Sequence, residues 1–302
     1  VDSKIEEKAK KQVISHASLI MEKKDEITIK PLVQSANSTW VYPPISLLAD
    51  VSQKEADRGD VNYNASVIEK TLESFGIRAR VAEVNKGPAV TQYALEITRG
   101  TKLSRITALS NDLALALAAT TGQVRLEAPI PGRALVGIEI PNKRPEIVTE
   151  KHLLSSPVFT SNNDPLLVPL GLDVSGQPVA ASIAKMPHAL IAGATGSGKS
   201  VCIAALAVCL AMSNAPEDLR MVMIDSKMVE LIRFNGLPHL YGKVETDVQR
   251  ILGVLRWVVV EMEHRYKLLE AAKVRDIDAY NRQLQRRKDV QTLPRIVVLI
   301  DE

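Results

Sequence analysis

Residues 193–200 read Gly193-Ala194-Thr195-Gly196-Ser197-Gly198-Lys199-Ser200. They fit the pattern G-x-x-x-x-G-K-[ST], the Walker A motif or P-loop, whose glycines let successive backbone N–H groups turn inward around phosphate oxygens. The short apolar run 189–192 before the loop predicts a strand, and the apolar run 201–212 after it predicts a helix. A phosphate-binding loop requires this context, and an ordinary Gly/Ser turn is the alternative.

The residues of this loop have separate expected roles. We expect Lys199 to neutralise the β- and γ-phosphates of a nucleotide and the Ser200 hydroxyl to hold Mg²⁺. The backbone from Gly193 to Val201 is the predicted cradle for the phosphates, helped by the positive end of the helix that follows.

A second motif lies at residues 295–302. The apolar run Arg295-Ile296-Val297-Val298-Leu299-Ile300 is followed by Asp301 and Glu302, which predicts a buried strand that ends in two carboxylates, the Walker B pattern. We expect Asp301 to reach Mg²⁺ and Glu302 to orient and polarise the water that attacks the γ-phosphate. An ordinary strand that ends in an acidic turn is the alternative, and the P-loop weakens it because phosphoryl transfer needs both carboxylate functions beside the phosphates.

Composition limits the class of protein. The chain has 302 residues, 46% of them hydrophobic and 24% charged, which suits two globular domains. The net charge of +3 is too small to indicate a nucleic-acid partner by itself, and no apolar run is long enough to predict a membrane span. Cys202 and Cys209 lie seven residues apart on a predicted helix, too far to form a disulfide, which favours a reducing cytoplasm.

The chain divides into three predicted parts. Residues 1–42 are charged and mixed in sign, and predict a linker or arm with a helical stretch from Lys4 to Lys11. Residues 43–160 predict a small α+β subdomain, and residues 161–302 an α/β domain with a parallel sheet. Because the chain starts without methionine and stops directly at Glu302, we expect it to be a fragment of a longer polypeptide.

Inside the α+β part, apolar spacing predicts a helix over 64–75 that stops at Gly76. Strands are predicted over 77–84 and 89–97, joined as a hairpin at Gly87-Pro88, and again over 124–130 and 134–140. A single amphipathic helix is predicted over 101–121.

In the second domain, Gly- and Pro-punctuated strands are predicted over 165–181, and a further strand over 220–225. A long helix is predicted from an N-cap at Thr246 to about residue 272. The apolar residues expected to point inward from it are Val248, Ile251, Leu252, Leu255, Val258, Val259, Met262 and Tyr266.

Further motifs carry a specific resemblance. They are Met223-Ile-Asp-Ser-Lys-Met-Val-Glu-Leu231, Gly236-Leu-Pro-His-Leu240, Arg256-Trp257, Glu261-Met-Glu-His-Arg-Tyr-Lys267, and, upstream, Gly87-Pro-Ala-Val-Thr-Gln-Tyr-Ala-Leu-Glu96, Pro131-Gly132 and Ile140-Pro-Asn-Lys143. With residues 186–200 they resemble the motor of FtsK/SpoIIIE DNA translocases over residues 43–302.

The resemblance implies a RecA-like P-loop NTPase that is incomplete at its C-terminal end, preceded by that family's α subdomain. It implies ATP and Mg²⁺ as cofactors, and a homo-hexameric ring that encircles double-stranded DNA and moves along it during chromosome segregation and cell division. It also implies that the motor works in the cytoplasm, with a membrane tether and division or recombination partners outside this chain. A strand after Glu302 is expected between the P-loop strand and the strand at 295–301, and the same continuation is expected to carry a trans-acting arginine and pore loops.

Several residues keep two interpretations. Ser226 stands where the family usually has proline, while Asp225 and Lys227 suit either a supporting role at the site or a loop salt bridge. A basic cluster of Arg282, Arg286, Arg287 and Lys288 suits DNA phosphates or a solvated loop. His188, His239 and His264 lack the spacing of metal ligands and are interpreted as structural or surface residues.

Other functions compete with DNA translocation. A protein-secretion ATPase would typically carry several motor domains in tandem, and a conjugative coupling protein for single-stranded DNA would carry a helical insertion in place of the α+β part. A ring subunit without activity is disfavoured by the intact Lys199, Ser200, Asp301 and Glu302.

Overall fold

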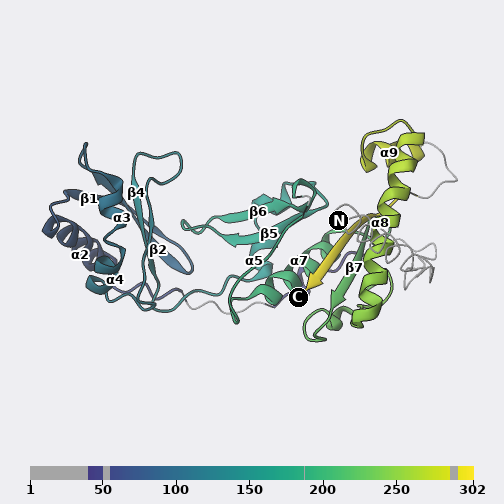
Figure 1. Cartoon of the computed structure of the whole chain (residues 1–302), viewed down its shortest axis with the longest axis horizontal. Helices are drawn as coiled ribbons and strands as arrows, with labels where there is room; N and C mark the ends of the chain where they lie inside the picture. The colour runs from purple at the N-terminus through teal and green to yellow at the C-terminus, as the bar shows by residue number, and fades with distance from the viewer. Residues whose placement is uncertain (1–39, 50–54, 187, 286–291) are drawn as a thin grey trace, which may run out of the picture. The chain divides into compact units, whose positions relative to one another are not determined.

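The computed structural model describes residues 40–49, 55–186, 188–285 and 292–302 (Figure 1). They form two compact units, Val41–Asn214 and residues 215–302 with Trp40. Nearly all of the predicted arm, 1–42, lies outside the described residues. Of the helices in the described part, none combines the length and the apolar character of a membrane span.

The first unit opens with an α+β module. Its antiparallel sheet has the order β1-β2-β4-β3, from β1 Ala79–Lys86, β2 Val90–Ile97, β3 Arg125–Glu127 and β4 Val136–Pro141. The helices are α2 Val61–Ser74, α3 Leu103–Thr107 and α4 Ser110–Ala116, after a short 3₁₀ turn, η1 Ile45–Leu47. The helix before Gly76 and the hairpin at Gly87-Pro88 are confirmed.

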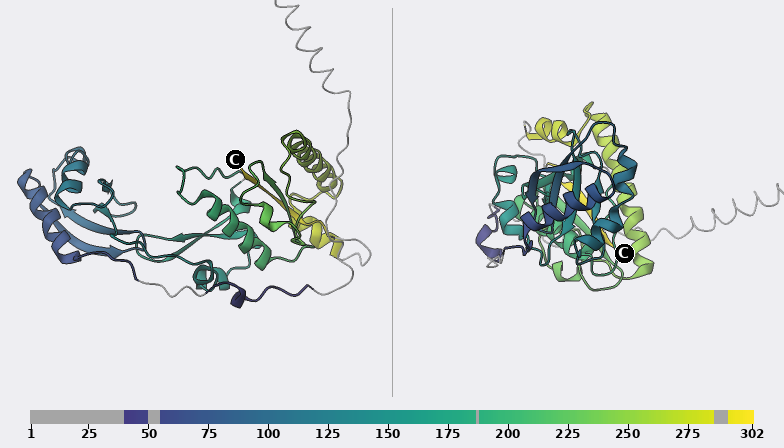
Figure 2. Two further views of the ribbon diagram at one scale, coloured as in Figure 1. Left: turned by 90° about the horizontal axis from the view of Figure 1, so that it is seen from below. Right: turned by 90° about the vertical axis from the view of Figure 1, so that its left-hand side faces the viewer.

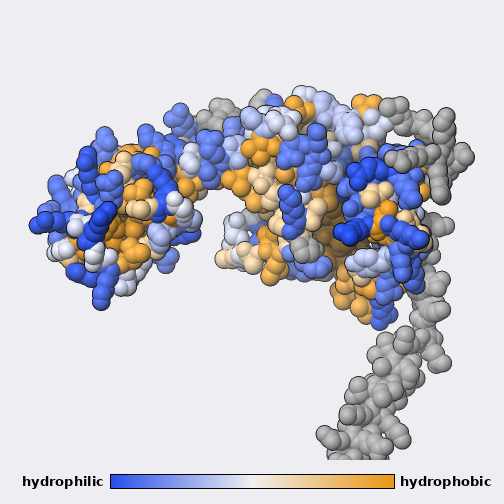
Figure 3. Space-filling model, turned by 90° about the horizontal axis from the view of Figure 1, so that it is seen from above, coloured by the Kyte–Doolittle hydropathy of each residue, from blue (hydrophilic) through white to orange (hydrophobic). Residues whose placement is uncertain are grey.

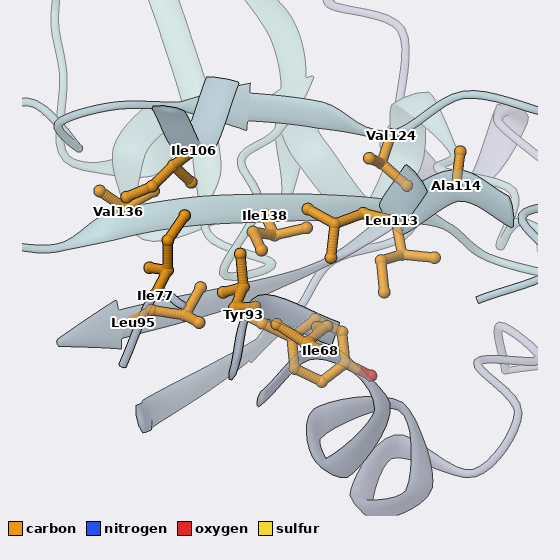
Figure 4. Packing of buried hydrophobic residues seen from close by; sticks show 12 residues of the cluster. Ile68, Ile77, Tyr93, Leu95, Ile106, Leu113, Ala114, Val124, Val136 and Ile138 are labelled. Atoms are coloured by element: carbon orange, nitrogen blue, oxygen red, sulfur yellow. The ribbon is translucent and has the colours of Figure 1, made fainter. Parts of the chain in front are cut away.

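Alternation along the strands builds the core of this module. Tyr93 and Leu95 on β2 and Ile138 on β4 point to the same face of the sheet, where α2 and α4 cover them (Figures 2 and 4). The buried cluster consists of Ile68, Leu72, Ile77, Tyr93, Leu95, Ile106, Leu113, Ala114, Val124, Val136, Ile138 and Ile140. Burial of about a dozen apolar side chains on one side of a sheet is the main force that holds the module together.

The single helix predicted over 101–121 is wrong, because the chain forms α3 and α4 with a break at Ala108 and Leu109. Leu109 N–H donates to the Ile106 carbonyl at 3.0 Å, a tightened turn that ends α3. The Ser110 hydroxyl donates to the Val124 carbonyl at 2.9 Å, which ties the start of α4 to the segment before β3. The apolar spacing runs on through this break and gives no sign of it.

The rest of the first unit supports the P-loop helix. It contains α5 Glu150–Leu154, α6 Pro157–Thr160, the antiparallel pair β5 Leu167–Leu172 and β6 Pro178–Ser182, η2 Ile183–Lys185, and α7 Lys199–Ser213. α7 packs on β5, and its C-terminal neighbour Asn214 donates from Nδ2 to the Pro165 carbonyl at 2.9 Å. The β5–β6 turn approaches the β1–β2 turn closely, since a methyl group on Gly87 would lie 3.0 Å from the Val174 carbonyl oxygen.

The strand predicted over 189–192 is absent from the described structure. Residues 189–192 have no strand assignment, and Leu190 is 93% exposed. An extended apolar segment becomes a strand only when a neighbouring strand pairs with its N–H and C=O groups, and none among the described residues does so. Apolar composition therefore predicts the tendency here but not the partner.

The second unit contains a parallel pair of strands. β7 Leu219–Asp225 and β8 Arg295–Asp301 run in register from Leu219↔Arg295 to Asp225↔Asp301. Between them the chain forms η3 Ile232–Phe234, α8 Val248–Ala271 and α9 Ile277–Gln285. The predicted parallel α/β arrangement is confirmed in this pair, and the two strand ends meet at one edge.

The long helix differs from its prediction in two ways. Its N-cap is Asp247, whose carboxylate accepts from Gln249 N–H, and not Thr246. Only the stripe of Ile251, Val254 and Trp257 packs into the described core. Six of the residues expected to point inward are exposed: Val248, Leu252, Leu255, Val259, Met262 and Tyr266.

These exposures have a simple cause. A helix buries only the face that meets a neighbour, and the described part of the second unit covers one stripe of α8. On the face of the molecule in Figure 3, apolar residues likewise reach the surface in several places among charged side chains. Apolar spacing thus indicated a wider contact face than the described residues cover.

The core of the α+β module can be tested on α4. Leu113 is fully buried and Leu115 is 83% exposed on the same helix. We expect Leu113→Ala to lower the free energy of unfolding by about 2–5 kcal/mol, because it removes buried methyl groups and leaves a cavity. Leu115→Ala, the control, is expected to change it by less than about 0.5 kcal/mol. Urea unfolding followed by circular dichroism measures both, and equal losses would contradict the assigned core.

Candidate active site

The predicted site residues lie in two parts of the structure: the P-loop in the first unit, and Asp301 and Glu302 in the second. The structure brings residues together within each of these halves.

The backbone of the P-loop depends on glycine. Gly196 has φ +80° and Gly198 has φ +94°, a left-handed conformation that is costly for residues with a Cβ atom. Gly198 is the N-cap of α7 and provides no capping side chain, and the first turn of α7 contains no acidic residue. The first N–H groups of this 15-residue helix are therefore left for an anion, in the positive field of the helix end.

Within the loop, Lys199 folds back. Its Nζ donates to the Gly193 carbonyl oxygen at 2.8 Å. Ser197 N–H donates to the Ala194 carbonyl at 3.1 Å, which closes the turn in front of the helix. The loop from Gly193 to Gly198 is exposed, so the ammonium group of Lys199 can exchange this carbonyl for phosphate oxygens without opening a core.

The acidic half stands at the ends of β7 and β8, where parallel pairing sets Asp301 beside Asp225. Both are buried, with Asp225 at 0% and Asp301 at 6% exposure. The Asp225 carboxylate accepts hydrogen bonds from the backbone N–H groups of Val229, Glu230, Leu231 and Ile232. Among the described residues no hydrogen bond or ion pair engages the Asp301 carboxylate, so its oxygens suit a divalent cation.

Glu302 follows β8 directly and is exposed. Its carboxylate forms an ion pair with Lys227, and its carbonyl oxygen accepts from the Ser226 hydroxyl at 3.2 Å. Of the two interpretations of Lys227, a salt bridge is therefore present. Asp225 does not touch Glu302 in this way; its carboxylate is used to hold the loop that carries Lys227.

Of the remaining candidates, His239 is buried, whereas His188, His264 and Arg282 are exposed. The His239 ring is buried edge-on against Trp40, with ring centroids 5.4 Å apart. No group of three or more His, Cys, Asp or Glu side chains is placed to hold a metal ion within the residues that were described. Arg282 lies on α9, whereas the rest of the predicted basic cluster, 286–288, falls outside the described residues.

Cys202 and Cys209 are free thiols. The carboxyl group that acts on both of them, Glu150, was not predicted from the sequence. Burial raises the pKa of Cys209 to about 12 and also raises the pKa of Cys202, in each case with a smaller contribution from the negative charge of Glu150. Glu150, on α5 next to α7, is itself half-buried, and burial raises its pKa to about 7. A glutamate in a first helical turn is ordinary in a sequence, so no local signal reveals its burial.

The loop at the N-terminus of α7 and the parallel strands ending in Asp define the class of P-loop nucleotide-binding proteins. The chain belongs to the FtsK/SpoIIIE family: that family's model matches residues 151–301, and the FtsK alpha domain matches residues 42–142. The resemblance noted from the motifs is thereby confirmed.

Curated relatives carry related names. A DNA translocase FtsK of Clostridium tetani is 46% identical over 266 residues, covering 87% of this chain and 36% of the relative. A DNA translocase FtsK of Caldanaerobacter subterraneus is 41% identical, covering 100% of this chain and 44% of the relative. A DNA translocase SftA of Bacillus subtilis is 41% identical, covering 89% of this chain and 28% of the relative. The chain thus spans less than half of the length of these relatives.

Two solved structures have some likeness. One is the monomer form of the conjugation coupling protein TcpA of pCW3 with ATPγS, with a TM-score of 0.42 and 20% identity over 79% of this chain and 64% of that chain. The other is the cytoplasmic domain of the type VII secretion ATPase EccC of Thermomonospora curvata, with a TM-score of 0.39 and 28% identity over 46% of this chain and 17% of that chain.

The buried carboxyl beside α7 gives a pH prediction. Because the folded pKa of Glu150 is raised to about 7 from 4.5, the folded state binds a proton that the unfolded state releases between these pH values. The contribution of Glu150 to stability therefore falls as pH rises from about 4.5 to about 7. We expect Glu150→Gln to unfold at a higher temperature than wild type at pH 8, and the difference to shrink towards pH 4.5.

Differential scanning calorimetry across this pH range measures the effect. Glu73→Gln, at an exposed position on α2, is the matched control and is expected to track wild type throughout. An equal response of the two variants at every pH would contradict the burial of Glu150.

Proposed function

We propose that this chain is part of the motor of an ATP-driven double-stranded DNA translocase that acts in chromosome segregation and cell division. The observation that carries the proposal is the uncapped, acid-free N-terminus of α7 behind a Walker A loop, in a chain that matches both the FtsK/SpoIIIE family and its alpha domain. The relatives' printed names, DNA translocase, support DNA as the substrate.

The residues present fit ATP with Mg²⁺. The N–H groups from Gly193 to Val201 would cradle the phosphates, and Lys199 would exchange the Gly193 carbonyl for β- and γ-phosphate oxygens. The Ser200 hydroxyl and the unengaged Asp301 carboxylate are the proposed Mg²⁺ ligands. When bound, Mg²⁺ would offset the negative charge that develops on the phosphates.

Glu302 is the proposed group that orients water. A carboxylate accepts a hydrogen bond from water, which aligns the water oxygen with the phosphorus atom and draws off its proton as attack proceeds. Glu302 directly follows Asp301, the last residue of β8, which places the two carboxylates next to each other in the chain.

The wider assembly is part of the same proposal. A homo-hexameric ring around the DNA, a motor located in the cytoplasm, and a membrane tether with division or recombination partners would belong to the longer protein. The predicted domains, 43–160 and 161–302, also stay predictions.

ATP hydrolysis by the full-length protein tests the function. We expect double-stranded DNA to raise the steady-state rate several-fold and single-stranded DNA of the same length to raise it much less. Stimulation by single-stranded DNA alone would favour a conjugative coupling protein. ATPase activity that ignores both nucleic acids would overturn the proposal and favour a secretion ATPase.

Lys199→Ala tests the phosphate cradle. Removing the ammonium group takes away charge-assisted hydrogen bonds worth about 1.5–3 kcal/mol, so ATP affinity should fall by at least about tenfold. Isothermal titration calorimetry with a non-hydrolysable ATP analogue measures it. Lys70→Ala, on the exposed face of α2, is the control and is expected to bind like wild type.

Glu302→Gln tests the water-orienting role separately from binding. We expect ATP affinity to persist while kcat falls by about 10²–10⁴-fold, because the amide cannot take a proton. Rapid-quench hydrolysis measures kcat, and Glu263→Gln, exposed on α8, serves as the control. Equal retention of ATP by Lys199→Ala and Glu302→Gln would argue against the separate roles assigned to them.

A further inference from the structure

The loop after β7 is held in one shape by a buried side chain. The Asp225 carboxylate accepts from the N–H groups of Glu230 at 3.0 Å and Leu231 at 2.8 Å, and from those of Val229 and Ile232 at 3.3 Å. Asp225 itself is fully buried at the end of the strand, so it cannot move without the strand. The loop from 226 to 231 is thus tied to the end of β7.

This loop contacts Glu302 at two atoms. The Lys227 ammonium group pairs with Oε2 of Glu302, and the Ser226 hydroxyl donates to the Glu302 carbonyl oxygen at 3.2 Å. The contacts form because β7 and β8 are parallel and in register, with Asp225 opposite Asp301, so the residues that follow each strand lie side by side. Residues some 75 positions apart in the sequence are joined in this way.

Glu302 is held in a backbone conformation that a glutamate does not favour. Its φ of +56° lies in the left-handed region, which is unfavourable for a residue with a Cβ atom. Two side-chain contacts are made to Glu302 in this conformation. Ser226 supplies one at the main chain and Lys227 supplies one at the carboxylate.

We propose that Lys227, assisted by Ser226, is a positioning residue that aims the Glu302 carboxylate during ATP hydrolysis. The proposal rests on the proposed function of Glu302 and adds to it the group that orients it. With Oε2 engaged by the ammonium group, Oε1 is left to accept a hydrogen bond from water. Orientation matters because a catalytic group displaced by about 1 Å can lose a large part of its rate effect.

The Lys227–Glu302 ion pair contributes little to the stability of the fold, so a positioning role can be separated from a structural one. The side chains of Lys227 and Glu302 are 61% and 46% exposed, and exposed ion pairs contribute little to folding. Replacing Lys227 should therefore leave the fold intact and act on the chemical step. The second contact uses the Ser226 hydroxyl as its donor, so removing that hydroxyl removes the contact.

Steady-state ATPase kinetics of the full-length protein with double-stranded DNA test the proposal. We expect Lys227→Gln to lower kcat by about three- to tenfold with an unchanged KM for ATP, as an exposed charge pair allows. Lys227→Arg, which keeps the charge, should restore most of the loss. Ser226→Ala should cause a smaller loss of the same kind. Lys243→Gln, an exposed lysine in the same unit, is the control and should match wild type.

A double-mutant cycle decides whether Lys227 acts through Glu302. In the Glu302→Gln background, Lys227→Gln should cause no further loss of kcat. A full additional loss in that background, a rise in KM in place of a fall in kcat, or an unchanged kcat would each overturn the proposal. Thermal unfolding of each variant shows that the fold is retained; should Lys227→Gln lower the unfolding temperature, Ser226→Ala takes the same cycle in its place.

The two proposals fail in different ways. If wild type and Glu302→Gln hydrolyse ATP equally, the role of Glu302 is wrong and the positioning role falls with it. If Glu302→Gln abolishes hydrolysis while Lys227→Gln has no effect, only the positioning role is overturned.

Discussion

The parallel pairing of β7 with β8 is the constraint on which the chemistry of the second unit depends. It sets Asp225 beside Asp301 and places the residues that follow them at a single edge. Neither strand could present its carboxylate usefully alone, because an unpaired strand has no fixed direction for its ends. The two aspartates differ in their contacts. The Asp225 carboxylate accepts hydrogen bonds from four backbone N–H groups, whereas the Asp301 carboxylate accepts none from the described residues.

The P-loop half depends on helix N–H groups that have no side-chain partner. α7 begins without a capping side chain and without an acidic residue in its first turn, so neither its first N–H groups nor its dipole is compensated by a side chain. Glycines at the left-handed positions let the loop turn in front of the helix. The Lys199 ammonium group donates to the Gly193 carbonyl oxygen, a hydrogen bond that it can exchange for one to a phosphate oxygen. In both halves a neighbouring group contacts the side chain with a proposed role: the Gly193 carbonyl for Lys199, and the Lys227 ammonium group for Glu302.

Predictability differed with the range of the interaction. The hairpin at Gly87-Pro88, the helix that stops before Gly76 and the strand ending at Asp301 were predicted well, because turn residues, helical apolar spacing and a continuous apolar run are local patterns. The strand at 189–192 and the inward face of α8 were not, because each needs a partner surface that the local sequence does not name. The break between α3 and α4 was missed because the apolar spacing continues across it.

The sequence by itself determined the chemical inventory: the P-loop, the carboxylates at 301 and 302, and the motifs that identify the family. These are short patterns in which residue type and spacing carry the physics directly. Only the tertiary structure decided that the Asp225 carboxylate accepts hydrogen bonds from the loop after β7, that Lys227 forms an ion pair with Glu302, and that Glu150 is half-buried beside α7. Each of these depends on strand register or helix packing between segments distant in sequence, and no local pattern specifies which residues such packing will bring together.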